Sequence, residues 1–92
     1  MKVRLFATLR PLAGGKHVEV PAQPGETVGA VLNRLVDLHP RLEGEVLSPD
    51  RQALLPHVQV FLAGRSVRDM EGLQTVLTQA DDMAVFPPVA GG

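Results

Sequence analysis

The sequence predicts an α+β domain in which a mixed sheet of four or five strands carries one main helix packed on one face. Apolar and polar residues alternate in segments 2–10, 17–20 and 58–62, and this period of two is typical of strands with one buried face. Between them, segment 28–38 carries apolar residues at helical spacing. A chain of 92 residues has room for one small domain, and one helix with several strands packs as two layers.

The first two strands are expected to form a hairpin. The alternation from Lys2 to Arg10 places four apolar residues on the inner side, namely Val3, Leu5, Ala7 and Leu9. Pro11 and the pair Gly14-Gly15 supply turn residues, and segment 17–20 alternates again. We therefore predict that strands 2–10 and 17–20 pair across a turn.

One long helix follows this hairpin. Thr27 is a residue type that caps helix N-termini, and Pro40 ends the helix because proline disfavours helical geometry in the residue before it. The apolar face recurs every three or four residues: Val28, Val31, Leu32, Leu35 and Leu38. This stripe predicts the helix that covers the sheet.

The second half of the chain contains shorter elements. We expect a short helical turn and a loop in 41–56, a strand at 58–62, a turn at 63–65, a short strand at 66–68, a loop with one tight turn at 72–77, a turn at Asp81-Asp82 and a last strand at 83–86. Pro87-Pro88 must end that strand, because proline cannot donate a hydrogen bond to a sheet. This order resembles the β-grasp, or ubiquitin-like, fold, with a domain over 1–86 and a flexible C-terminal tail over 87–92.

The composition argues against several classes of function. A formal net charge of −1 provides no basic excess for nucleic-acid binding. Without cysteine, disulfides, thiolate metal sites and a cysteine nucleophile are excluded. His17, His39 and His57 lack metal-ligand spacing, so no metal site is expected. No run approaches the roughly 18 apolar residues of a spanning helix and the first residues do not resemble a signal peptide, so we expect a cytoplasmic protein that binds no membrane.

The tail has a composition suited to a narrow channel. Pro87-Pro88 favours an extended path, and Val89-Ala90 is small. Gly91-Gly92 lacks side chains altogether and can adopt backbone angles that other residues cannot. A frayed terminus would also explain two final glycines, but their position after a last strand and two prolines is more specific. The sequence therefore predicts a slim probe with the Gly92 carboxylate at its tip.

The whole chain resembles the MoaD/ThiS family of sulfur carriers. The resemblance rests on Leu5-Phe6-Ala7-Thr8-Leu9-Arg10, on Gly25-Glu26-Thr27-Val28-Gly29, and on Asp81-Asp82 followed by Val85-Phe86-Pro87-Pro88-Val89-Ala90-Gly91-Gly92. It implies that an E1-like adenylating enzyme consumes ATP to activate Gly92, that a sulfur donor converts Gly92 to a thiocarboxylate, and that an acceptor enzyme receives the sulfur. It also implies a carrier subunit with no bound cofactor and no catalytic residue of its own.

Two acceptor enzymes have the most support from the resemblance, and a role in thiamin biosynthesis or tRNA thiolation has less. The ending Phe86-Pro87-Pro88-Val89-Ala90-Gly91-Gly92 is most similar to the small subunit of molybdopterin synthase, which would make the acceptor the large subunit of that enzyme and the pathway molybdenum cofactor biosynthesis. Other features are similar to CysO-type carriers, whose acceptor is a cysteine synthase: Leu9-Arg10-Pro11 with Gly14-Gly15, the long segment 41–56, and Val67-Arg68 followed by Gly72-Leu73. Leu62-Ala63-Gly64 also replaces the Val-Asn-Gly that is common in the molybdopterin branch.

Strand parity predicts a docking face for these partners. Phe6, Phe61 and Phe86 each fall on the side opposite the inward-facing residues of their strands. If the three strands are neighbours, the rings share the helix-free face, and exposed aromatic clusters mark binding surfaces. A parity slip of one residue would place them in the core instead. Lys2, Arg4, Arg10 and Lys16 form a modest basic edge, for which solvated charge is the simpler interpretation and steering of a partner is the alternative.

Two other classes of function stay open. A ubiquitin-like protein modifier would use the same tail to form isopeptide bonds, although only Lys2 and Lys16 could serve as sites for chain building. A plain binding domain with an inert tail is the third possibility. An oxygen-for-sulfur exchange at the terminus separates the carrier from both.

Overall fold

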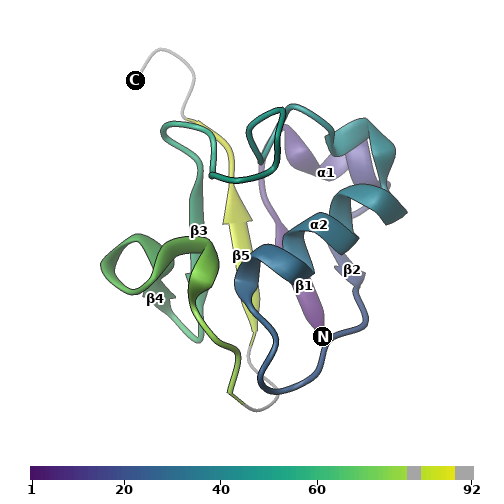
Figure 1. The fold of residues 1–92 in the computed structure, drawn as a ribbon. Helices are drawn as coiled ribbons and strands as arrows, with labels where there is room; N and C mark the ends of the chain where they lie inside the picture. The colour runs from purple at the N-terminus through teal and green to yellow at the C-terminus, as the bar shows by residue number, and fades with distance from the viewer. Residues whose placement is uncertain (79–81, 89–92) are drawn as a thin grey trace.

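The computed structural model describes residues 1–78 and 82–88. Within them, five strands form one sheet in the order β2-β1-β5-β3-β4 (Figure 1). The strands are β1 (Lys2–Leu5), β2 (His17–Glu19), β3 (Gln59–Leu62), β4 (Arg65–Ser66) and β5 (Met83–Phe86). This mixed sheet with one main helix confirms the α+β, β-grasp architecture that the sequence predicts.

The centre of the sheet is the parallel pair β1 and β5. Leu5 lies opposite Val85, and Val85 lies opposite Val60 of the antiparallel neighbour β3. All three side chains are fully buried, so they point to the same side of the sheet. The other pairs, β1 with β2 and β3 with β4, are antiparallel. The expected pairing of the first two strands is therefore confirmed.

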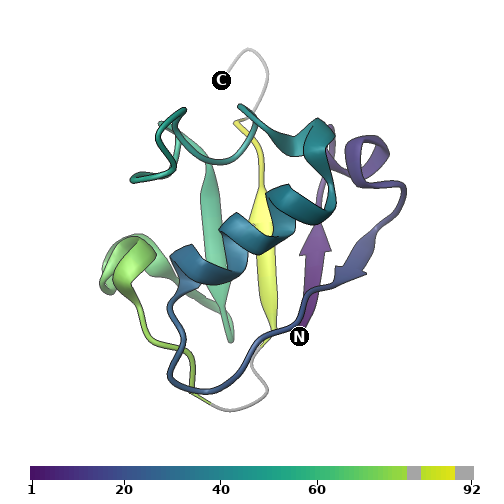
Figure 2. The same ribbon diagram turned by 45° about the vertical axis from the view of Figure 1, so that its right-hand side comes forward.

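Helix α2 (Val28–Leu38) lies diagonally across one face of the sheet, as Figure 2 shows. The backbone N–H of Ala30 donates to Oγ1 of Thr27 at 3.1 Å, which confirms Thr27 as the N-cap. The helix ends before Pro40, as expected. Leu38, the last residue of the helix, is expected on the buried face but is 51% exposed.

The first strand is much shorter than the predicted segment 2–10. β1 stops at Leu5, Ala7 adopts a left-handed φ of 51°, and a short helix α1 (Leu9–Ala13) follows. Ala7 is exposed rather than inward-facing, whereas Leu9 is buried from the helix rather than from a strand. α1 ends at Gly14, which has a φ of 78° and caps the helix C-terminus in the left-handed region.

Short 3-10 turns connect the remaining elements. η1 (Pro40–Leu42) confirms the helical turn expected after α2. η2 (Val67–Asp69) begins directly after β4, so the strand expected at 66–68 is instead Arg65–Ser66. η3 (Gly72–Gln74) is the expected tight turn, and its Leu73 packs against α2 at Gly29.

The core fills the space between the sheet and α2. Its side chains are apolar and come from the sheet, both helices and the connections, including Val3, Leu5, Leu9, Val31, Leu32, Leu35, Leu42, Val46, Leu47, Val60, Val67, Met83 and Val85. Leu42, Val46 and Leu47 show where the irregular segment 41–56 buries its apolar residues. Among the described residues, every helix is too short or too polar to cross a lipid bilayer.

Candidate functional site

The chain leaves the sheet at Phe86. β1 ends just before the left-handed Ala7, and β3 begins two residues after His57, which has a φ of 68°. Phe86 pairs with Gln59, the first residue of β3, and follows Val85, which pairs with Leu5, the last residue of β1. Both neighbouring strands therefore stop pairing with β5 at Phe86. Pro87 is half-buried and Pro88 is exposed, whereas Val89, Ala90, Gly91 and Gly92 lie outside the described residues. The division into a domain and a flexible tail therefore stays a prediction.

The three phenylalanines form one aromatic cluster at this exit. Phe6 and Phe86 stack with ring centroids 4.1 Å apart and planes 12° apart. Phe61 meets Phe86 edge-on, with centroids 5.7 Å apart and an interplanar angle of 80°. Both geometries are favourable for aromatic pairs. Each ring is half-buried, so part of the cluster remains accessible.

The cluster lies on the face of the sheet that α2 does not cover, here called the open face. Phe61 lies opposite Ala84, and the neighbours of these residues along β3 and β5, Val60 and Val85, point into the core. Alternation along a strand places Phe61 and Phe86 on the other side. The rings contact one another, and the core under α2 is built without them. The structure thus places the rings where strand parity predicted them, and their role in docking is a proposal.

Arg10 belongs to this surface, although the alternation in segment 2–10 predicts a strand there. Its guanidinium carbon lies 5.2 Å from the centroid of the Phe6 ring, and its Nε donates to the carbonyl oxygen of Leu5 at 2.8 Å. α1 brings Arg10 back over Phe6. The spacing of Leu9, Leu12 and Ala13 before Gly14 is the signal that would have revealed this helix.

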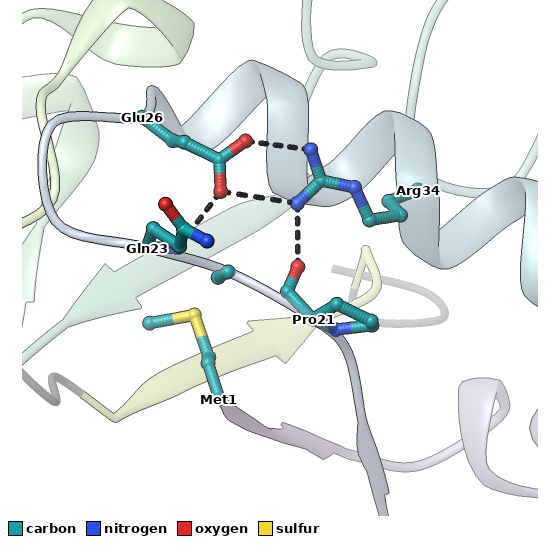
Figure 3. A pocket seen from close by; sticks show the side chains of 6 residues that line it. Met1, Pro21, Gln23, Glu26 and Arg34 are labelled. Atoms are coloured by element: carbon teal, nitrogen blue, oxygen red, sulfur yellow. Dashed lines mark hydrogen bonds and ion pairs between the residues drawn. The ribbon is translucent and has the colours of Figure 1, made fainter.

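A separate hollow of about 570 Å³ lies at the opposite end of β1, beside Met1 (Figure 3). Its charged groups are Glu26 and Arg34, which form an ion pair with Oε2 and Nη2 2.6 Å apart. The backbone N–H of Gln23 donates to Glu26 Oε1 at 2.8 Å, and Arg34 also donates to the Pro21 carbonyl. The hydrogen bond from Arg34, followed by the one from Gln23, holds the pKa of Glu26 below its usual value. These contacts brace the loop before α2 and leave no unsatisfied charge for a ligand.

A metal centre has no support in the described part of the chain. No group of three or more histidine, aspartate or glutamate side chains is placed there to hold an ion. His17 is on the edge strand β2, His39 follows α2, and His57 precedes β3. The expected turn at Asp81-Asp82 is described only in part, because Asp81 lies outside the described residues.

Comparison with known proteins places this arrangement in a family. A model of the ThiS family matches residues 3–92. Small archaeal modifier protein 3 from Haloferax volcanii is 37% identical over 92 residues, which are 100% of this chain and 98% of that protein. Sulfur carrier protein CysO from Mycobacterium bovis is 31% identical over 91 residues, 98% of this chain and 96% of that protein.

The fold gives the same result. The crystal structure of SAMP1 from Haloferax volcanii matches with a TM-score of 0.84 and 36% identity, covering 99% of this chain and 97% of that one. The family match spans nearly the whole chain and includes the Gly91-Gly92 ending. This chain therefore belongs to the ThiS family of ubiquitin-like sulfur carriers and modifiers.

Proposed function

We propose that this protein carries sulfur as a thiocarboxylate on Gly92. The observation that carries the proposal is the chain exit at Phe86, where the last strand, two prolines and a small-residue ending follow an accessible aromatic cluster. The similarity to a sulfur carrier over almost the full length of both chains supports it. A carrier requires a deliverable carboxylate and a docking surface, and it requires no catalytic residue of its own.

The chemistry explains why an activating partner is needed. A carboxylate is a poor electrophile, so one Gly92 oxygen would attack the α-phosphorus of ATP and pyrophosphate would leave. With sulfide as the donor, HS⁻ would then attack the activated carbonyl carbon, AMP would leave with the former carboxylate oxygen, and loss of the S–H proton would give the thiocarboxylate. An E1-like adenylating enzyme would position ATP for the first step and hold the acyl-adenylate for the second. This chain would supply only the carboxylate. The thiocarboxylate that results is a nucleophile for an acceptor enzyme.

The aromatic cluster is proposed as the surface on which these enzymes hold the carrier. Phe86 directly precedes Pro87, so a partner that covers Phe6, Phe61 and Phe86 is also placed at the base of the tail. Burial of one ring by a partner could contribute on the order of 1.5–3 kcal/mol. The same surface would serve the adenylating and the acceptor enzyme in turn, because both must receive the same tail.

Two different acceptor enzymes are each supported by one observation. The tail motif favours the large subunit of molybdopterin synthase, and with it a role in molybdenum cofactor biosynthesis. The similarity to CysO favours a cysteine synthase-like acceptor. The similarity to a small archaeal modifier protein adds a second candidate function, in which the activated Gly92 is conjugated to lysines of other proteins.

One reaction tests the carrier proposal. The full chain is incubated with ATP, the E1-like enzyme of the same organism and a sulfide source, and its intact mass is measured. We expect the gain in mass that corresponds to exchange of one oxygen for sulfur, with no such gain in a chain lacking Gly92. Unchanged mass in the full chain, or equal thiolation of the truncated chain, would contradict the proposal.

The acceptor is then identified with the loaded carrier. Sulfur transfer to the molybdopterin precursor in the presence of the large synthase subunit supports the molybdopterin pathway. Formation of cysteine with a cysteine synthase-like enzyme supports the alternative. Slower-migrating conjugates in whole-cell extracts, lost on deletion of Gly92, support the modifier.

A further inference from the structure

The cations of the open face lie along β1 and above it. The outward side chains of β1 are Lys2 and Arg4, followed by Phe6 with Arg10 above it. Lys2 lies opposite Glu19 of β2, whereas Arg4 lies opposite His17. Along β3 the outward side chains are the uncharged Gln59 and Phe61, and Ala84 lies between the two strands. The aromatic cluster therefore has a cationic border toward β1 and a neutral border toward β3.

Within the described residues, neither of the two arginines nearest the cluster forms an ion pair. Arg34 pairs with Glu26, and Arg51 pairs with both Asp37 and Glu43 at 2.8 and 3.0 Å. Arg41, Arg65 and Arg68 also form no ion pair in this part of the chain. Within the described residues, no carboxylate oxygen lies within 4.0 Å of Arg4 or Arg10. Arg4 instead has His17 and Ala84 as its cross-strand neighbours. The cationic border is thus available to carboxylates of another molecule.

Arg10 is also held in place before any partner arrives. Its hydrogen bond to the Leu5 carbonyl and its position over the Phe6 ring fix the guanidinium beside the cluster. A side chain that is already ordered loses less conformational entropy on binding. Its remaining N–H donors can meet a carboxylate at low cost. In this respect Arg10 differs from a surface arginine whose side chain is free in solvent.

We propose that the E1-like adenylating enzyme presents carboxylate side chains opposite Arg4 and Arg10, and that this charge pairing steers the carrier into productive orientation. The inference rests on the proposed function, since it assumes that this enzyme docks on the open face. A steering charge is needed most at this step. The carrier has a formal net charge of −1 and brings a carboxylate to a site that holds the triphosphate of ATP. A cationic border turned toward the enzyme offsets that repulsion while the two proteins are still apart.

The proposal predicts an effect on association more than on lifetime. Charges at the rim of an interface change the association rate and its salt dependence, whereas apolar anchors set the dissociation rate. We expect R4E to lower the association rate about tenfold at low ionic strength and to flatten its dependence on salt. R4K keeps the charge and should bind as the unchanged chain does.

The experiment measures association and dissociation rates of the full chain with the adenylating enzyme of the same organism, at low and high KCl. R41E is the matched control, because Arg41 is exposed in η1, away from the open face. R10Q is a second, independent test of the border. Circular dichroism on each variant checks that the fold is kept.

A salt-dependent association rate that R4E and R10Q lower and R41E leaves unchanged supports the proposal. The proposal is overturned if association does not depend on salt, if R4E and R41E behave alike, if the enzyme does not bind, or if only the acceptor enzyme shows the effect. The thiolation assay reports separately on the carrier function. Salt-dependent binding without any mass gain would contradict the carrier role and leave the steering proposal supported.

Discussion

Phe6 and Phe86 stack face to face across the parallel pair β1 and β5, with ring centroids 4.1 Å apart. The contact joins the residue after β1 to the last residue of β5, which directly precedes the two prolines. It lies outside the core beneath α2, although both rings are half-buried by their neighbours. The aromatic cluster therefore combines a modest structural role with an accessible surface.

Truncation of Phe61 should weaken partner binding more than it weakens the fold. We expect Phe61→Ala to lower the free energy of unfolding by about 1 kcal/mol, because one edge-on contact and a partly exposed ring are lost. Its Kd for the adenylating enzyme should rise by at least about tenfold, from the lost apolar burial. Leu38→Ala, on the exposed end of α2, is the control and should bind normally. If the free energy of unfolding falls by more than about 3 kcal/mol while the Kd is unchanged, the Phe61 ring belongs to the core.

A side chain at position 29 should destabilise the protein. An added Cβ would lie 3.1 Å from the carbonyl oxygen of Leu73 and 3.2 Å from its Cβ. Backbone cannot rotate away as a flexible side chain can, so overpacking should outweigh the helix propensity that alanine adds. We expect Gly29→Ala to lower the free energy of unfolding by about 1 kcal/mol and Gly29→Val by more. Chemical denaturation measures both, and a stabilised Gly29→Ala would show that η3 yields freely.

Replacing Ala7 with glycine should relieve a left-handed backbone conformation and should not lower the free energy of unfolding. Its φ of 51° costs an alanine about 1–2 kcal/mol, and glycine adopts this angle freely while losing more entropy on folding. Ala7→Gly should therefore be neutral or raise the free energy of unfolding by up to about 1 kcal/mol. Ala30→Gly, within α2, should instead lower it by about the same amount. Equal losses in the two variants would rule out strain at Ala7.

The Glu26–Arg34 pair should contribute to acid sensitivity. The hydrogen bond from Arg34 lowers the pKa of Glu26 below its ordinary value, so the folded protein holds this proton more weakly than the unfolded chain does. The resulting stability is present above the pKa of the unfolded chain and is lost as the pH falls through the lower folded pKa. Glu26→Gln should reduce the dependence of the melting temperature on pH in this acidic window. Glu45→Gln, at an exposed position, is the control. If the melting temperature of Glu26→Gln depends on pH as strongly as that of the unchanged chain, the assignment to Glu26 is refuted.

The regular elements were predictable because their signals are local. The stripe from Val28 to Leu35 and the cap at Thr27 defined α2, and alternation defined the inner residues of β3 and β5. The parity of the three phenylalanines followed from the same alternation. Segment 2–10 was misassigned because Leu9 continues the alternation of β1, even though it also begins the helical spacing of α1. Where a segment fits both the period of a strand and the period of a helix, the packing of its side chains in the tertiary structure decides which element forms.

Four features were predictable from the amino-acid sequence alone: the fold class, the helix and its cap, the side of the sheet on which the aromatic rings lie, and the tail motif that marks the family. These depend on residue type and short-range spacing. The three-dimensional packing was needed to show that Phe6 and Phe86 stack, that Arg10 returns over Phe6, and that Arg4 and Arg10 form no ion pair within the described residues. Those relationships join residues distant in the chain through the β1–β5 pairing. Their physical basis is the strand register, which brings the end of the first strand beside the end of the last.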